Sequence, residues 1–263
     1  IPFDKESTGM FVKQLPFELT VDQKKAAWEI LQDMEETRPM NRLLEGDVGS
    51  GKTAVAGLVT HAALQHGLQV AVMAPTEILA EQHYASFKNM LPDVTMGLLT
   101  GSVSRISSKD MSDVSKKKQR EACLLALAAG DMQVVIGTHA LLTSDVVFHQ
   151  LGLVIVDEQH RFGVDQRKTI REKMGKEYAS PHFLSMTATP IPRSFALTLY
   201  GDLDISIIKT MPAGRKPIQT RMVAPHNRQK AYEFIAAQVT LGRQVFVICP
   251  LIQEKIDDDM VTK

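Results

Sequence analysis

The run GDVGSGKT, residues 46–53, fits the G-x-x-x-x-G-K-[ST] pattern of a phosphate-cradling loop. Its glycines permit a tight turn with positive φ, which lets successive backbone N–H groups converge on a phosphate. Lys52 would place its ammonium on the β- and γ-phosphates, and Thr53 its hydroxyl on Mg²⁺. We therefore expect a nucleoside triphosphate and Mg²⁺ here, contacted by Gly46, Asp47, Val48, Gly49, Ser50, Gly51, Lys52 and Thr53.

A second chemical motif ends the apolar run LGLVIVDE, residues 151–158. Asp157 would hold Mg²⁺ opposite Thr53, and Glu158 would polarise a water for in-line attack on the γ-phosphate. Phosphoryl transfer requires mainly positioning and charge compensation, to which Lys52, Mg²⁺ and Glu158 contribute. The arginine finger that completes many such sites has no recognisable motif in this sequence.

The segment LPFELTVDQ, residues 15–23, precedes the phosphate loop. Thr20 is a suitable N-cap for a helix that continues to about Met34. In the first turn of that helix, Gln23 offers an amide that can bond an adenine edge, and Phe17 an aromatic ring that can pack on the base. The alternative is that Gln23 is a solvated helix residue and Phe17 belongs to the core.

The remaining chain must position these groups, and from residue 69 it alternates apolar strands with helices. This alternation predicts an α/β fold with a mostly parallel sheet covered on both faces. Right-handed crossovers then bring the loop after every strand to one edge of the sheet. Each of these loops is also compatible with an ordinary capped turn, and they comprise residues 74–82, 99–102, 137–142, 157–160 and 185–193.

Composition excludes several classes of protein. The 263 residues are 44% hydrophobic and carry a formal net charge of +0, which is ordinary for a globular protein and argues against wholesale coating of nucleic acid. The only two cysteines, Cys123 and Cys249, suggest neither a zinc site nor a disulfide framework. Without a signal-like start or a long apolar run, we expect a cytoplasmic protein with no membrane partner.

One local charge run stands out at residues 105–120, where six basic residues accompany two acidic ones. Such a run is usually a solvated face. A flap that contacts phosphates is the alternative, because the run directly follows the loop at residues 99–102.

The proline- and glycine-containing segment PAGRKP divides the chain. We expect a lead-in at residues 1–14, a nucleotide-binding domain at 15–211, a linker at 212–217 and the start of a second α/β domain at 218–263. The second domain should open with a strand at 218–223, a helix at about 227–241 and a strand at 244–249. Both ends of the chain suggest a fragment of a longer protein.

In their order, GDVGSGKT, DEQH and SMTATP resemble motifs I, II and III of superfamily 2 helicases, and LPFELTVDQ resembles their adenine-reading segment. APTEILAEQ, LTGS and GTHALL are similar to the single-strand-contacting segments of that superfamily. The longer runs at residues 157–167, 186–206 and 212–218 resemble the RecG family, ATP-dependent translocases that remodel stalled forks and Holliday junctions in DNA recombination and repair. The resemblance extends from about Leu15 to Leu251.

This resemblance implies a RecA-like three-layer sandwich that uses ATP and Mg²⁺. It assigns ATP contacts to Gln159 and His160, which with Thr187 and Thr189 would couple the γ-phosphate to the DNA groove. Backbone contacts to single-stranded or double-stranded DNA would come from Pro75, Thr76, Gly101, Thr138 and His139. The family's wedge domain and most of its second motor lobe are missing, so we expect the chain alone to bind nucleotide weakly and to hydrolyse it poorly.

Three other interpretations are considered. A transcription-repair coupling translocase shares TATPIPR and RFGV, but has Glu where this chain has Gln159 and lacks AGRKPI. A nucleotide-gated binding module would use the phosphate loop as a switch, with Glu158 not acting as a base. A metabolic kinase would need a dedicated acceptor pocket and lid. The five loops that follow the strands in order argue against this interpretation.

Overall fold

The computed structural model describes residues 1–108, 114–158, 180–189, 203–212 and 218–248. The chain forms two compact units, Ile1–Arg215 and Lys216–Lys263. The first unit contains the sheet and the residues expected to do chemistry.

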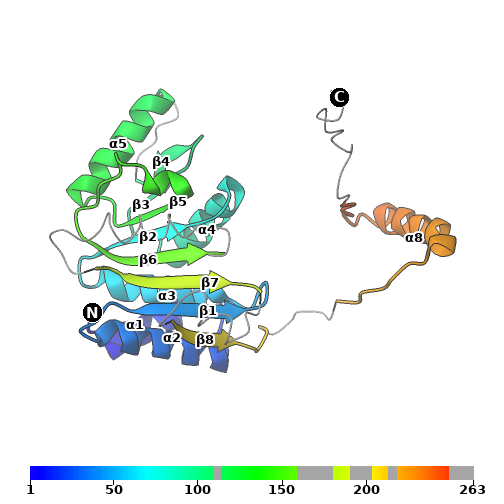
Figure 1. Ribbon diagram of the computed structural model, residues 1–263, viewed down its shortest axis with the longest axis horizontal. Coiled ribbons are helices and arrows are strands. Elements are labelled where there is room, and N and C mark those ends of the chain that lie inside the picture. Colours follow the sequence, from blue (N-terminus) through cyan, green and yellow to red (C-terminus); the bar gives the residue numbers. More distant parts are fainter. Residues whose placement is uncertain (109–113, 159–179, 190–202, 213–217, 249–263) are drawn as a thin grey trace, which may run out of the picture. The chain divides into compact units, whose positions relative to one another are not determined.

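A single sheet of eight strands, in the order β4-β3-β5-β2-β6-β7-β1-β8, forms the centre of the first unit (Figure 1). Every neighbouring pair is parallel except β3 with β4, which confirms the mostly parallel α/β fold expected from the sequence. The strands are β1 Asn41–Gly46, β2 Gln69–Met73, β3 Met96–Leu99, β4 Ser104–Ile106, β5 Val134–Gly137, β6 Leu151–Asp157, β7 His182–Thr187 and β8 Asp204–Ile208.

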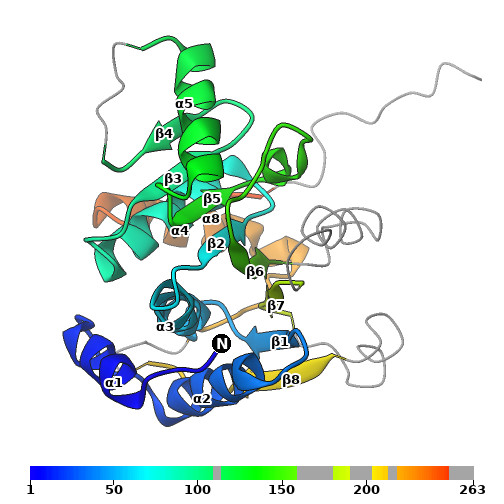
Figure 2. The same ribbon diagram turned by 90° about the vertical axis from the view of Figure 1, so that its left-hand side faces the viewer.

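Helices cover the sheet because successive strand residues point to opposite faces. Val70 and Val72 of β2 belong to one buried cluster, and Ala71 and Met73 belong to the other. The first cluster packs under α1 Lys5–Gln14, α2 Val21–Glu35, α3 Lys52–Leu64 and α4 Glu77–Met90. In Figure 2, α1, α2 and α3 lie on the same side of the sheet. The second cluster packs against α5 Lys116–Ala129 and the 3-10 helix η1 His139–Leu142.

The helix ends follow from local chemistry. Thr20 is the N-cap of α2, as expected, and its side chain accepts a bond from the Gln23 N–H, while the Gln23 side chain accepts one from the Thr20 N–H. This reciprocal arrangement is a capping box. Gly130 ends α5 with a φ of 85°, a left-handed conformation that glycine adopts without steric cost.

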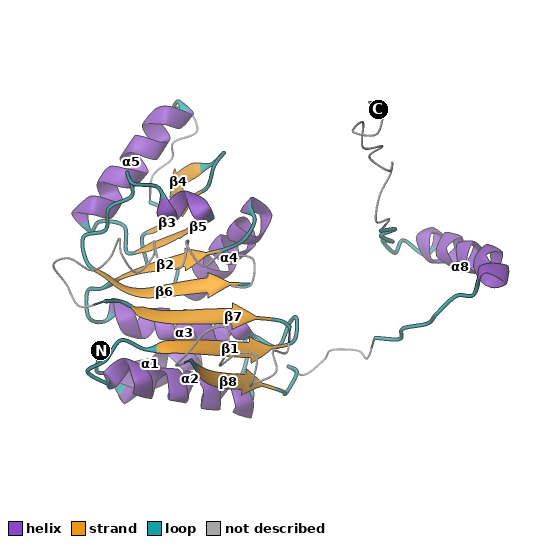
Figure 3. Ribbon diagram, in the orientation of Figure 1, coloured by secondary structure: helices purple, strands orange, loops and turns teal. Residues whose placement is uncertain are grey.

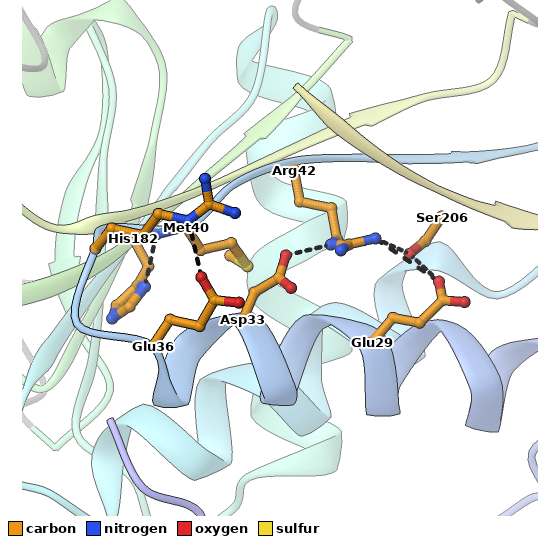
Figure 4. A network of polar contacts seen from close by, with 8 residues as sticks. Glu29, Asp33, Glu36, Met40, Arg42, His182 and Ser206 are labelled. Atoms are coloured by element: carbon orange, nitrogen blue, oxygen red, sulfur yellow. Dashed lines mark hydrogen bonds and ion pairs between the residues drawn. The ribbon is translucent and has the colours of Figure 1, made fainter. Parts of the chain in front are cut away.

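A buried ion-pair network joins β1 to α2 and β8 (Figure 4). Arg42 of β1 is 9% exposed, and its Nε lies 2.6 Å from Asp33 Oδ2. Its Nη1 lies 3.0 Å from Ser206 Oγ and 3.8 Å from Glu29 Oε2. Nearby, the Met40 N–H donates to Nδ1 of buried His182. These contacts fix the end strand β8 and helix α2 against the strand that leads into the phosphate loop.

The described part of the second unit, residues 218–248, contains η3 Pro225–Asn227 and α8 Arg228–Thr240 but no strand (Figure 3). The helix agrees with the sequence prediction. The strands predicted at 218–223 and 244–249 are wrong over their described residues, 218–223 and 244–248, and Cys249 lies outside the described part. A strand is stabilised by hydrogen bonds to a neighbouring strand. No described residue of this unit supplies one, and α8 buries none of its side chains. Across the described part of the chain, no helix has the length and apolarity needed to cross a membrane.

Candidate functional site

The phosphate loop connects the end of β1 to the start of α3, at the carboxyl edge of the sheet. Gly49 and Gly51 have φ of 78° and 90°, so both adopt the left-handed conformation that the sequence pattern predicts. The loop is tightly closed, because a β-carbon on Gly46 would lie 2.5 Å from Ser50 Oγ. Ser50 Oγ is itself buried and has no hydrogen-bond partner among the described residues.

Lys52 folds over this loop. Its Nζ donates to the carbonyl oxygens of Gly46 at 2.6 Å and Asp47 at 3.2 Å. Burial lowers the pKa of Lys52, and the nearby carboxylates of Asp157, Glu158 and Asp47 act in the opposite direction. A partly desolvated ammonium and a cradle of backbone groups together suit a polyphosphate anion, so the residues present fit the nucleotide that the sequence predicts.

The ammonium and the two acids share one cavity of about 390 Å³, which is lined by Lys52, Thr53, His83, Asp157 and Glu158 among others. A second cavity of about 510 Å³ is lined by residues that include Phe17, Gln23, Gly51 and Thr53. Gly51, Thr53 and Ser86 border both cavities. The structure therefore places the predicted phosphate-binding, metal-binding and base-binding residues around two adjoining spaces.

Asp157 is the last residue of β6, and its Oδ2 lies 2.8 Å from Nε2 of His83 on α4. Sequence reasoning did not identify His83. The available signal was its position on the buried stripe of α4, where Ala80 and Phe87 are apolar and a histidine needs a polar partner. His83 limits the orientations open to the Asp157 carboxylate.

Glu158 has a φ of 52° and is the only described residue other than glycine with positive φ. Its N–H donates to the Met186 carbonyl at 2.8 Å, and its Oε1 accepts from the Ala188 N–H at 3.1 Å. Thr187 and Thr189 flank Ala188, with their hydroxyl oxygens 3.0 Å apart. The predicted hydrolytic acid is thus bonded directly to the segment predicted to sense the γ-phosphate.

Gln23 is buried, with 2% of its surface exposed, so it is not a solvated helix residue. Its Oε1 accepts from the Thr20 N–H at 2.8 Å and its Nε2 donates to the Ser50 carbonyl at 2.7 Å. An amide has two donor hydrogens and a two-lone-pair oxygen, so bonding capacity remains at each end. Phe17 is 45% exposed and lines the cavity of about 510 Å³, rather than belonging to the core.

The expected DNA-contacting residues follow three adjacent strands, β2, β5 and β3. Thr76 caps α4, Gly101 lies beside Glu77, and both are exposed, as is His139. Thr138 is 3% exposed and its hydroxyl accepts from the Ala140 N–H, so its side chain supports the loop from inside.

The remaining predicted contact, Pro75, is half-buried just after β2. Gln159 and His160 lie outside the described residues, as does the run at 161–167.

Comparison with known proteins identifies the family to which the chain belongs. The DEAD/DEAH box helicase family matches residues 20–197. ATP-dependent DNA helicase RecG of Streptococcus pneumoniae serotype 4 is 49% identical over 240 residues, which cover 91% of this chain and 33% of that protein. RecG of Bacillus subtilis is 48% identical over 96% of this chain and 35% of that protein. The chain therefore spans about a third of the length of these curated relatives.

Solved structures agree. The structure of RecG bound to a three-way DNA junction superposes with a TM-score of 0.77 and 42% identity, covering 95% of this chain and 32% of that one. The DEAD-box helicase Mss116 bound to ssRNA and UDP-BeF, at 18% identity and a TM-score of 0.60, covers 92% of this chain and 51% of its own and shares the RecA-like fold. The chain belongs to the DEAD/DEAH box helicase family, and over nearly all of its length it is similar to RecG.

Proposed function

We propose that this chain contains the first motor domain of an ATP-dependent DNA translocase that remodels branched DNA, such as stalled forks and Holliday junctions. The observation that carries this proposal is the shared cavity, which is lined by Lys52, Thr53, Asp157 and Glu158. The relatives named ATP-dependent DNA helicase RecG support the activity. A relative's complex with a three-way DNA junction supports the substrate class. The relatives come from bacteria, in which DNA lies in the cytoplasm, and this favours a cytoplasmic location.

In this proposal Thr53 and Asp157 would hold Mg²⁺, and the bound ion would compensate negative charge on the nucleotide phosphates. Lys52 leaves the loop carbonyls to bind the phosphate oxygens, and the backbone N–H groups of residues 49–53 complete the cradle. Glu158 orients and polarises the attacking water, and its position is fixed by the bond from the Ala188 N–H. His83 limits the orientations open to the Asp157 carboxylate through the contact between its Nε2 and Asp157 Oδ2.

Coupling to DNA would pass through the segment after β7. Thr187, Ala188 and Thr189 form one hydrogen-bonded turn, and that turn bonds Glu158. A change in the bonding of Glu158 on hydrolysis would therefore shift this turn. We propose that Gln159 and His160 take part in this sensing, and that residues 75–76, 101 and 138–139 grip the DNA backbone without reading sequence.

The domain boundaries are part of the proposal. Residues 15–211 would form the first motor domain, 212–217 a linker, and 218–263 the start of the second. Because the chain has no recognisable arginine-finger motif, we expect slow hydrolysis from this chain alone; such a finger is worth about 10³–10⁵ in rate.

The test compares Glu158→Gln with Lys52→Ala in the chain as it stands. Glu158→Gln should remove the residual hydrolysis of ATP while fluorescent-nucleotide binding stays within about twofold of wild type, since the amide keeps the size of the side chain but is not a base. Lys52→Ala should weaken nucleotide binding itself. If Glu158→Gln hydrolyses ATP at the wild-type rate while an identically purified Lys52→Ala sample does not, Glu158 does not act as the base. If wild type and both variants hydrolyse ATP at the same rate, the hydrolysis comes from a contaminant and the non-enzymatic switch is favoured.

A further inference from the structure

Three consecutive lysines, Lys116, Lys117 and Lys118, form the first turn of α5 and are exposed. In the part of the chain that the structure describes, no carboxylate forms an ion pair with any of them; Asp110 and Asp113 belong to the segment that is not described. Cations in the first turn of a helix oppose its dipole. Stability of the fold therefore does not account for this charge.

The position of this turn is fixed by Arg120. The Nη2 of Arg120 donates to Thr143 Oγ1 at 3.2 Å and to Asp145 Oδ2 at 2.9 Å. Thr143 and Asp145 directly follow η1, which begins at His139 after the end of β5. We call the loops after β2, β5 and β3, which carry the proposed DNA contacts, the DNA-contacting row. The basic turn consequently lies beside the loop after β5, which is one of the three loops in this row. The ion pair with Arg120 offsets the negative charge of Asp145.

Helix geometry divides the three lysines. With about 100° of rotation per residue, side chains three or four positions apart share a face. Lys116 and Lys117 are therefore on the side of Arg120, toward the loop after β5. Lys118, two positions before Arg120, is rotated by about 200° and faces away from that loop.

We propose that Lys116 and Lys117 contact backbone phosphates of single-stranded DNA and extend the row formed by the loops after β2, β5 and β3 toward α5. This inference rests on the proposed function and adds to it a pair of contacts outside the helicase motifs. Lysines on a flexible stem bind phosphate as point charges, so the contact carries no sequence preference.

The test is the salt dependence of binding of a labelled oligothymidylate to the whole chain. The slope of log K against log salt is negative, and each lost phosphate contact on single-stranded nucleic acid reduces its magnitude by about 0.7, so Lys116→Ala/Lys117→Ala should make the slope less steep by about 1.4. Between about 50 and about 200 mM salt, the variant should then lose about sevenfold less affinity than wild type. Alanine favours helix, so α5 should persist, which circular dichroism and a thermal melt will check.

The matched control is Lys13→Ala/Lys24→Ala, which removes the same charge from α1 and α2 and should leave the slope unchanged. Lys118→Ala should change the slope much less than Lys117→Ala. Equal slopes in wild type and Lys116→Ala/Lys117→Ala, or equal decreases in both double variants, would overturn the inference while leaving the proposed function intact. Absence of any DNA binding by wild type would overturn both.

Discussion

Replacing Gln23 with alanine tests the connection between the start of α2 and the phosphate loop. The Gln23 amide accepts a bond from the Thr20 N–H and donates one to the Ser50 carbonyl. Gln23→Ala removes both bonds and leaves the carbonyl of Ser50, a residue that is 1% exposed, without this donor. The matched control is Thr20→Ala, which removes only the bond that the Gln23 N–H donates to the Thr20 hydroxyl and leaves the connection to the loop in place.

The magnitudes separate the two variants. Two hydrogen bonds at about 1 kcal/mol each, plus the cost of a buried unsatisfied carbonyl, give a loss of about 3 kcal/mol for Gln23→Ala. Loss of an N-cap hydroxyl costs about 1 kcal/mol. If roughly half of the Gln23 effect falls on the loop, nucleotide affinity should drop by about tenfold, which corresponds to about 1.4 kcal/mol. Thr20→Ala should leave nucleotide affinity unchanged.

Urea unfolding measures the change in the free energy of unfolding. Titration with fluorescent ATP and GTP measures the change in nucleotide affinity that results from the altered phosphate loop. Support of the loop predicts that Gln23→Ala weakens both nucleotides equally. Recognition of the adenine edge predicts instead that only ATP is weakened. Unchanged binding of both nucleotides, or equal losses in Gln23→Ala and Thr20→Ala, would refute the reasoning.

Three further predictions concern backbone conformation, buried charge and pH. Gly51 and Gly67 both have positive φ, but a β-carbon at Gly51 would clash with Gln23 Nε2, whereas one at Gly67 would meet nothing within 4 Å. Gly67→Ala should lower the free energy of unfolding in urea by about 1 kcal/mol and retain nucleotide binding. Gly51→Ala should abolish nucleotide binding. Arg42→Met should lower the free energy of unfolding by about 3 kcal/mol, because two carboxylates lose their buried partner. A loss of stability no larger than that caused by replacing an exposed lysine would contradict this prediction. Burial, with a contribution from the N-terminal ammonium, lowers the pKa of His182 to about 4. As pH falls from about 6.5, the unfolded chain therefore takes up a proton before the folded one, so stability should decline toward pH 4. In His182→Asn, the midpoint of urea unfolding should depend less on pH across this range than in wild type.

Most of the parallel sheet could be predicted from the sequence, as could the edge at which the loops after its strands meet. Continuous apolar runs predict buried parallel strands, and parallel strands bring their following loops to one edge whatever the details of packing. The helix beginning after Thr20, the helix at 77–90 and the end of α5 at Gly130 also depend on local chemistry that a sequence displays. Global topology and caps are therefore the predictable part.

Contacts between distant residues were not predictable in the same way. The short strand β4 escaped notice because three residues paired antiparallel at an edge have too little periodicity to detect. The strands predicted at 218–223 and 244–249 are wrong over their described residues for a different reason, since a strand-like pattern forms a strand only where a neighbour accepts its hydrogen bonds. His83 shows the same limit at the site, because its partner Asp157 is 74 residues away.

Glu158 shows how the two kinds of information combine. The motif predicts a carboxylate after β6, but it does not predict the φ of 52° that this residue adopts. In L-residues this conformation costs about 1 kcal/mol or more, so surrounding contacts must maintain it. The bonds from the Glu158 N–H to Met186 and from the Ala188 N–H to its carboxylate do so. Because both partners lie in one segment, a movement of residues 186–189 that breaks these two bonds would release the strain at Glu158, and this gives the proposed coupling between hydrolysis and DNA a physical basis.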